Sequence, residues 1–150
     1  MFGLFKKYDV HLCPEVKGKV LDNGIPVSNL TVHRWLCYTD EVEREDSAIT
    51  DNKGEFYLPE CKIRSKLPGR AFVESITNQL IYIEQKDVKT PLWQAVLEGR
   101  HPSEAFTYKL KTLNCDLSNP VVTFEFKSDF PKRTYSARGI CRWENDFQIY

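Results

Sequence analysis

The chain has 150 residues, 41% of them hydrophobic and 13% aromatic, which suits one domain with a buried core and excludes disorder over most of its length. Its 21 basic and 21 acidic residues leave no net charge, so it lacks the basic excess of a general nucleic-acid binder. Residues 1–7 place apolar side chains before the lysines, the reverse of a secretory signal, and no apolar run is long enough for a membrane span. We therefore expect a cytoplasmic protein.

The first strand is predicted over residues 15–22, where Val16 and Val20 share one face and lysines the other. Residues 22–24, Asp-Asn-Gly, predict a tight turn because Asn and Gly tolerate positive φ. The next strand is predicted over residues 30–38, which are rich in β-branched and aromatic side chains.

Residues 40–46, D-E-V-E-R-E-D, predict an acidic, flexible loop. Asp51 and Gly54 enclose a second turn, in which the carboxylate caps the backbone and the glycine takes the left-handed conformation. A short strand is predicted over residues 55–59, and Pro59 ends it because proline has no amide proton for a ladder.

Residues 62–67 predict another short strand, and residues 71–84 favour a hairpin that turns at 77–79. Thr90 and Pro91 suit the N-cap and first position of a helix, which Gly99 would end. A short helix is therefore predicted near residues 91–98.

The last third of the chain alternates most clearly between apolar and polar residues. Residues 106–111 and 122–127 are each typical of a strand, and a last strand is predicted over 134–143. Many short strands with one short helix predict an all-β, immunoglobulin-like or transthyretin-like antiparallel sandwich.

We expect one domain over residues 1–150. Its expected parts are an N-terminal arm (1–14), a first group of strands (15–59), and the remaining strands (60–150) with a helical insert (90–102).

Five cysteines are spread along the chain, and none forms a CxxC pair, so no zinc site is indicated. In the cytoplasm we expect reduced, mostly buried thiols. For an exported protein, a disulfide between Cys115 and Cys141 stays open as an alternative. The five are Cys13, Cys37, Cys61, Cys115 and Cys141.

Two segments carry a family resemblance: V-K-G-K-V-L-D-N-G-I-P-V-S-N-L-T-V at residues 16–32 and T-D-N-K-G-E-F-Y-L-P at residues 50–59. Residues 16–59 thereby resemble the carboxypeptidase-regulatory-like, transthyretin-like β-sandwich family. The resemblance implies a sandwich fold and an accessory or recognition role. As a small stand-alone protein the chain is also similar to bacterial immunity proteins that neutralise secreted toxins.

One branch of the resembled family, the hydroxyisourate hydrolases, is enzymatic. That likeness would require several catalytic His and Arg residues and a Tyr-Arg-Gly-Ser end. This chain ends in Phe-Gln-Ile-Tyr, and its histidines are His11, His33 and His101. We therefore expect no enzyme.

His33 shares a predicted strand face with Trp35 and Cys37. Two interpretations stay open: a hydrogen-bonded histidine on a partly covered face, and a Cys–His nucleophile pair, since a thiolate needs a base or positive neighbour. The carboxylates lack the D-x-D-x-D-G spacing of a calcium loop. No metal or cofactor is expected.

Partner-binding candidates come from three segments. The acidic run would face a basic partner surface, or be only a solvated loop. Trp93 beside Arg100 and His101 has the composition of an interface anchor, or covers an open end of the sandwich. Phe130 lies in a predicted turn at residues 130–133. The candidates are Glu41, Glu43, Glu45, Asp46, Trp93, Arg100, His101 and Phe130.

The sequence thus predicts a non-catalytic protein-binding module, most concretely an immunity or inhibitor protein that neutralises a secreted bacterial toxin. A glycan- or peptide-binding accessory module and an enzyme using His33 or His101 stay open as alternatives. We expect no nucleic-acid or membrane partner. An exposed edge strand would pair with a partner or with a second copy, and the sequence does not choose between them.

Overall fold

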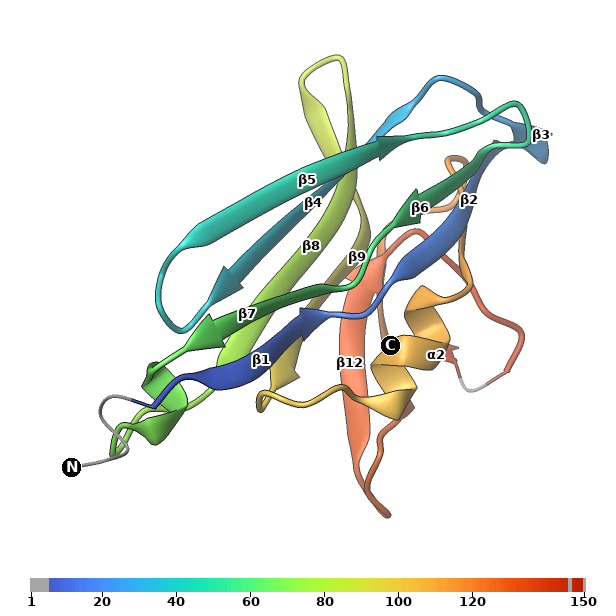
Figure 1. Ribbon diagram of the computed structural model, residues 1–150. Coiled ribbons are helices and arrows are strands. Elements are labelled where there is room, and N and C mark those ends of the chain that lie inside the picture. Colours follow the sequence, from blue (N-terminus) through green and yellow to red (C-terminus); the bar gives the residue numbers. More distant parts are fainter. Residues whose placement is uncertain (1–5, 146, 150) are drawn as a thin grey trace.

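The computed structural model describes residues 6–145 and 147–149, which form two facing β-layers with α2 (Glu104–Leu110) at one end (Figure 1). The larger layer is a seven-stranded sheet. Its strands are, from edge to edge, β13 (Gln148–Ile149), β11 (Val122–Lys127), β12 (Thr134–Gly139), β9 (Val88–Glu98), β8 (Ile76–Gln85), β4 (Thr31–Tyr38) and β5 (Glu43–Ile49).

The smaller layer consists of two separate sheets that lie across the larger one (Figure 1). Its strands are β1 (Tyr8–Cys13) paired with β7 (Cys61–Ser65), and β2 (Val16–Asp22) paired with β3 (Ile25–Pro26), β6 (Glu55–Leu58) and β10 (Leu113–Asp116). A 3-10 turn, η1 (Leu67–Gly69), follows β7. The β10–β2 ladder is parallel and the other ladders are antiparallel, so the all-β, sandwich-like prediction is confirmed.

The core lies between the layers and centres on Trp93, whose side chain is fully buried. Its ring centroid lies 5.5 Å from that of Phe106 and 5.8 Å from that of Phe126. The indole Nε1 donates to Gln79 Oε1 (2.9 Å), and Gln79 Nε2 donates to the Leu12 carbonyl (2.8 Å). This buried chain of hydrogen bonds joins the two layers, and it satisfies polar groups that would be costly to bury alone.

The helix predicted near residues 91–98 is wrong, because this segment forms β9. Trp93, Ala95 and Leu97 are buried, and the residues between them are exposed, which is the two-residue period of a strand. Pro91 fits into the ladder because the register shifts between Ile81 and Tyr82 on the neighbouring strand.

The strand predicted over residues 106–111 is also wrong, because residues 104–110 form helix α2. Ser103 is the N-cap, and its Oγ accepts from the Phe106 amide (3.2 Å). Phe106, Lys109 and Leu110 are buried at helical spacing. Tyr108 is exposed on the solvent side of the helix. The alternation that predicted a strand depended on counting this residue as buried.

Two predicted turns are misplaced. The hairpin expected within residues 71–84 is instead the single strand β8, and the chain turns at Lys86 and Asp87, which both have left-handed φ as two-residue hairpin turns require. The flexible loop expected over residues 40–46 is only partly a loop, because β5 begins at Glu43 and pairs along β4.

The turns predicted from glycine and aspartate are confirmed. Asn23 and Gly24 have φ of 49° and 82° between β2 and β3. Asp51 Oδ1 accepts from the amides of Lys53 and Glu55, each at 2.9 Å, while Gly54 has a φ of 77°. The strands predicted around these turns are the observed β2, β4 and β6.

Cys115 and Cys141 form a disulfide between β10 and the segment that follows β12. The expectation of reduced thiols is therefore wrong for this pair. Cys13, Cys37 and Cys61 are free. The disulfide ties the end of the larger sheet to the smaller layer.

The segment expected as an N-terminal arm includes residues 8–13, which form β1 and pair with β7. The absence of an export signal is predicted from residues 1–7, and residues 1–5 of these lie outside the described residues. Within the described residues, no helix has the length and apolar character needed to cross a membrane.

Candidate binding face

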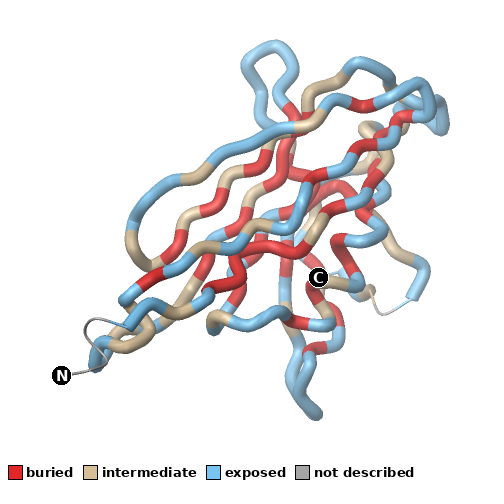
Figure 2. The backbone as a smooth tube through the Cα atoms, in the orientation of Figure 1, coloured by how far each residue is buried: buried red, intermediate tan, exposed pale blue. Residues whose placement is uncertain are grey.

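The outer face of the seven-stranded sheet is the side turned away from the smaller layer. Along β4, Arg34 and Leu36 are buried toward the core, whereas His33, Trp35 and Cys37 are half-buried on the outer face. Figure 2 shows the same alternation of buried and more accessible residues along the strands of this sheet. The predicted shared face of His33, Trp35 and Cys37 is thus confirmed.

One row of side chains crosses the outer face from strand to strand. The register aligns Glu45 with Trp35, Trp35 with Leu80, Leu80 with Gln94, and Gln94 with Arg138. With strands about 4.8 Å apart, the row spans about 19 Å. It leads from the acidic edge strand, over the apolar Trp35 and Leu80 and the amide of Gln94, to the guanidinium of Arg138.

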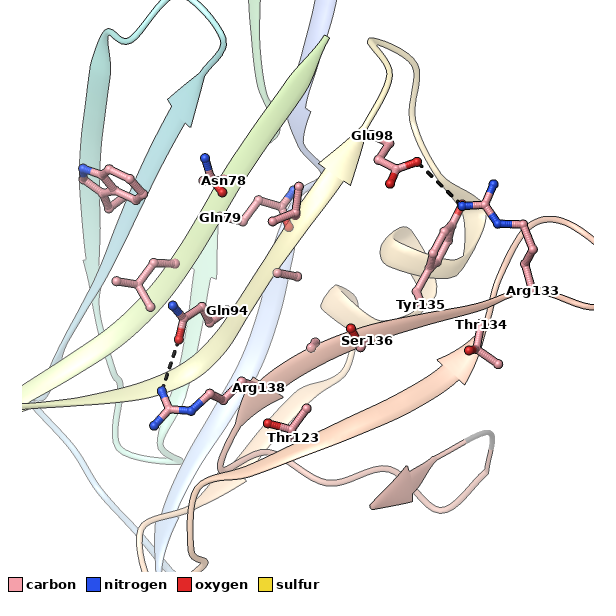
Figure 3. Close-up of a pocket in the computed structure, with 15 residues that line it drawn as sticks. Asn78, Gln79, Gln94, Glu98, Thr123, Arg133, Thr134, Tyr135, Ser136 and Arg138 are labelled. Atoms are coloured by element: carbon pink, nitrogen blue, oxygen red, sulfur yellow. Dashed lines mark hydrogen bonds and ion pairs between the residues drawn. The ribbon is translucent and has the colours of Figure 1, made fainter. Parts of the chain in front are cut away.

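A hollow of about 590 Å³ opens in the outer face where β9 and β12 diverge (Figure 3). These two strands pair at one register position only, Arg138 opposite Gln94. Residues 95–98 and 134–137 continue from that position without a ladder between them. Two neighbouring strands normally pair along their shared length, so the hollow is a split in the sheet.

Gly139 sets the narrow end of this split. A Cβ at this position would overlap the carbonyl group of Leu92, so only glycine allows β12 to approach β9 so closely. The next amide, that of Ile140, donates to the Pro91 carbonyl (3.1 Å). The strands are therefore held together on one side of the Arg138–Gln94 pair and open on the other.

The hollow has an apolar side and a polar side. Trp35, Leu80 and Val96 supply the apolar surface, and Val96 is 50% exposed. The indole N–H of Trp35 has no hydrogen-bond partner among the described residues. Hydroxyl and amide groups line the other walls, including Asn78 and Ser136 (Figure 3).

Two arginines and one glutamate are the charged residues of the lining. Arg138 Nη1 donates to the neutral Gln94 Oε1 at 3.2 Å. Arg133 Nη2 lies 3.7 Å from Glu98 Oε2, and both side chains are more than half exposed, so this ion pair is weak. Among the described residues no carboxylate forms an ion pair with Arg138.

The acidic candidates lie in different environments in the structure. Glu43 and Glu45 are exposed on β5, opposite Cys37 and Trp35, and so lie at the rim of the outer face. Glu41 precedes β5 with a left-handed φ of 62°. Asp46 instead turns toward the core side, where its Oδ1 accepts from Arg34 Nε (2.8 Å).

The other candidates do not form one cluster. Trp93 as an exposed anchor is wrong, because its side chain is buried in the core. The Arg100 guanidinium lies 5.1 Å from the Tyr8 ring centroid, and its Nη1 donates to the Asp9 carbonyl (3.1 Å). His101 is exposed in the segment that leads to α2.

Phe130 is exposed as predicted, at 54%, in the turn between β11 and β12. The guanidinium of Arg133, which lines the hollow, lies 5.7 Å from the Phe130 ring centroid. Phe130 is therefore linked to the outer-face hollow through this arginine.

The surroundings of Cys37 oppose a reactive thiolate. Burial raises the pKa of its thiol, and the nearby charges of Glu43 and Asp40 raise it further. His33 stacks on Tyr82 with ring centroids 5.0 Å apart. His33 thus packs against Tyr82, and Cys37 lies near carboxylates. This geometry does not favour the Cys–His nucleophile pair.

Sequence reasoning missed Arg138, Gln94, Leu80 and Val96. Gln94 and Val96 were hidden by the helix predicted over their segment, although their alternation with buried neighbours is a strand signal. Arg138 lies on the strand predicted over residues 134–143, which the structure forms over 134–139, but its row depends on which strands are neighbours, which the local pattern does not encode.

No group of three His, Cys, Asp or Glu side chains within residues 6–145 and 147–149 is arranged to hold a metal ion. The titratable groups with specific partners serve the fold instead. Asp116 accepts from the Ser118 hydroxyl and amide and from the amides of Gly24 and Asn23, and these bonds hold the pKa of its carboxyl at about 2.

A family model described as a domain of unknown function, DUF6795, matches residues 16–120. No curated protein and no solved structure matches the chain. The match begins at β2 and includes β9, so it covers the larger part of the outer face, while β12 with Arg138 follows it. The resemblance of residues 16–59 to carboxypeptidase-regulatory-like domains stays a prediction.

Proposed function

The chain belongs to the DUF6795 family, and from its surface we propose that it is a non-catalytic protein-binding module that uses the outer face of its seven-stranded sheet. The observation that carries the proposal is the row from Glu45 to Arg138. It combines an accessible tryptophan, an aliphatic centre and an accessible arginine on one rigid sheet. Tryptophan and arginine are the residues that most often dominate binding energy at protein interfaces.

The shape and charge of the face support the same proposal. The hollow gives a protruding segment of a partner a place to enter, and the apolar side chains of Leu80 and Val96 line it together with Trp35. Charges lie at the two ends of the row, in Glu45 and Arg138, whereas Leu80 occupies its centre. Interfaces commonly have this arrangement of an apolar centre and a polar rim.

In its most concrete form, the proposal makes the chain an immunity or inhibitor protein that occludes a secreted bacterial toxin. A non-catalytic module needs only to bind tightly and cover the partner's working surface. This role would require a stoichiometric complex rather than turnover, and a low dissociation rate.

Site-specific photocrosslinking tests the proposal. A photoreactive amino acid placed at Ser136, on the outer face, should crosslink one protein partner in the native host in a Trp35-dependent manner. The same group at Glu55, on the exposed side of the smaller layer, is the control position and should not. Partner crosslinks that form only from Glu55, or that persist in W35A, would contradict the proposal.

A glycan-binding module is the second candidate, and the lining of the hollow is the observation that favours it. Amides and hydroxyls, such as Asn78, Gln94 and Ser136, surround a half-buried indole. Sugars also bind through stacking on aromatic rings and hydrogen bonds to such groups. Glycan-array binding that is lost in W35A would support this candidate over a protein partner.

A further inference from the structure

We propose that the hollow receives an extended, acidic segment of the partner protein, which pairs with the free strand edges of β9 and β12 and places a carboxylate on Arg138. This inference rests on the proposed protein-binding function. It specifies the conformation of the bound segment and its charge.

The free strand edges provide the first argument. Residues 95–98 of β9 pair with β8 on one side only, and residues 134–137 of β12 pair with β11 on one side only. Their other edges face each other across the hollow (Figure 3). Unpaired strand edges bind extended peptides through main-chain hydrogen bonds, with neighbouring side-chain pockets adding specificity.

The position of these strand edges favours the binding of a single peptide over edge-to-edge association with another sheet. They lie inside the seven-stranded sheet, between β8 and β11, and not at its outer margin. The hollow between them, about 590 Å³, falls within the roughly 300–1,000 Å³ typical of ligand sites. A single extended segment fits this description better than a second folded sheet.

Charge provides the second argument. Arg138 lies at the closed end of the split, and its one hydrogen-bond partner among the described residues is the neutral Gln94. A guanidinium has five N–H donors, and a carboxylate accepts two of them in a planar, bidentate pair. The arginine is therefore oriented by the amide and still able to bind an anion.

The remaining charges of the hollow favour the same sign of ligand. Arg133 and Arg138 outnumber the single lining carboxylate, Glu98. The acidic side chains Glu43 and Glu45 lie on β5, at the far end of the outer face. They would repel a carboxylate placed near Trp35, so the acidic part of the segment is directed toward Arg138.

The direction of the strands sets the spacing of the bound segment. A segment that pairs with β9 and β12 runs along them, so every second side chain of the segment faces outward. Along β9, Gln94 beside Arg138 and the exposed Val96 are two residues apart. We therefore expect an acidic residue and an apolar residue two positions apart in the partner segment.

A random peptide library displayed on phage, selected on the full-length protein, tests the inference. Enriched peptides are synthesised and titrated by calorimetry against wild type, R138Q, W35A and K53Q. Lys53 is an exposed cation in the turn before β6, so K53Q removes one positive charge away from the hollow. Hydrogen exchange is measured with and without peptide.

The expected peptides carry an acidic residue and an apolar residue at the spacing given above. R138Q should weaken their binding about tenfold or more, as loss of a charge-assisted pair does, and K53Q should leave it unchanged. Binding should slow amide exchange at residues 95–98 or 134–137. An N-methylated peptide backbone should bind more weakly, because it removes the donors of strand pairing.

The outcomes separate this inference from the function on which it rests. Peptides that bind in a Trp35-dependent manner, but are neutral or basic, insensitive to R138Q, or without protection at either strand edge, would overturn the inference alone. If no selected peptide depends on Trp35 or Arg138, the proposed protein-binding role of the outer face fails as well.

Discussion

The two faces of the seven-stranded sheet are built from the same strands, yet residues of the same type have opposite environments on them. On the inner face, Trp93 is fully buried and donates its indole N–H to Gln79. On the outer face, Trp35 is half-buried and its N–H has no partner among the described residues. The first tryptophan is used by the fold, and the second is available for the binding role proposed above.

The two arginines of the sheet differ in the same way. Arg34, on the inner face, is 2% exposed, donates to Asp46 and gives Nη1 to the Pro59 carbonyl (2.8 Å). Arg138, on the outer face, is exposed and bonded to one neutral amide. Arg34 thus has its donors used within the protein, whereas most donors of Arg138 remain available for the binding role proposed above.

Replacing each tryptophan by alanine tests this comparison of the two faces, and it is expected to give the largest change in the free energy of unfolding. W93A should lower the free energy of unfolding by about 3–5 kcal/mol, because it leaves a large cavity and strands the Gln79 amide. W35A should cost less, about 2 kcal/mol, because part of its side chain stays in solvent and its indole N–H has no partner to lose. Urea denaturation followed by circular dichroism measures both.

The comparison would be wrong if W35A destabilised the protein as much as W93A. Trp35 would then be a core residue, and its use in binding would have no support from stability data.

Reduction of the Cys115–Cys141 disulfide is expected to have the next largest effect. The bond closes a loop with a sequence separation of 26 residues, so its removal should cost about 3 kcal/mol through the entropy of the unfolded chain. The double variant C115A/C141A, compared with wild type in urea, measures the loss. C37A is the control, since Cys37 is a free cysteine on the outer face and its loss should cost much less.

Asp46 and Glu45 form the most closely matched pair, because they are neighbours on β5 that point to opposite faces. D46N should cost about 1–2 kcal/mol, since it weakens the charge-assisted bonds to the buried Arg34; the value is reduced because Asp46 is 40% exposed. E45Q should change stability by less than about 0.5 kcal/mol. Equal effects of the two substitutions on stability would contradict the assignment of Asp46 to the core side and of Glu45 to the outer face.

The sequence predicts the fold well where a local chemical rule acts. Asn23, Gly24 and Gly54 sit at the predicted turns because few other residues accept positive φ there. It fails where tertiary context overrides the local signal. Pro91 resembles a helix start until the register shift in β8 gives it a place in the sheet, and Tyr108 completes a strand-like pattern although it is exposed on α2.

The candidate site was harder to predict than the fold for a related reason. Its side chains are ordinary outward-facing residues of β4, β8, β9 and β12, which no local motif marks. They become a row only through strand order, and strand order depends on pairings between residues as far apart as Gln94 and Arg138. The acidic composition of residues 40–46 is visible in the sequence, but its place is not, because the sequence predicts a flexible loop where Glu43 and Glu45 lie on β5.

The smallest expected effect is a pH dependence of stability that comes from a buried histidine of the smaller layer. His11, on β1, is 6% exposed, and burial lowers the pKa of its imidazole, while the hydrogen bond and charge of Glu60 partly raise it again. In the unfolded chain the pKa is about 6.5. Between that value and the lower folded pKa, the unfolded state binds more protons, so stability should fall as the pH drops below about 6.5.

Urea denaturation of wild type and H11Q between pH 7.5 and 5.5 measures this term as the difference between the two slopes. H11Q should lose less stability than wild type on acidification, because it has no imidazole to protonate in the unfolded chain. H101Q, which changes an exposed histidine, retains His11 and so should keep the contribution of that residue. If the slope of H11Q equals that of wild type, His11 is not buried in its neutral form, and water reaches the core side of the smaller layer, in contrast to the burial of the inner face described above.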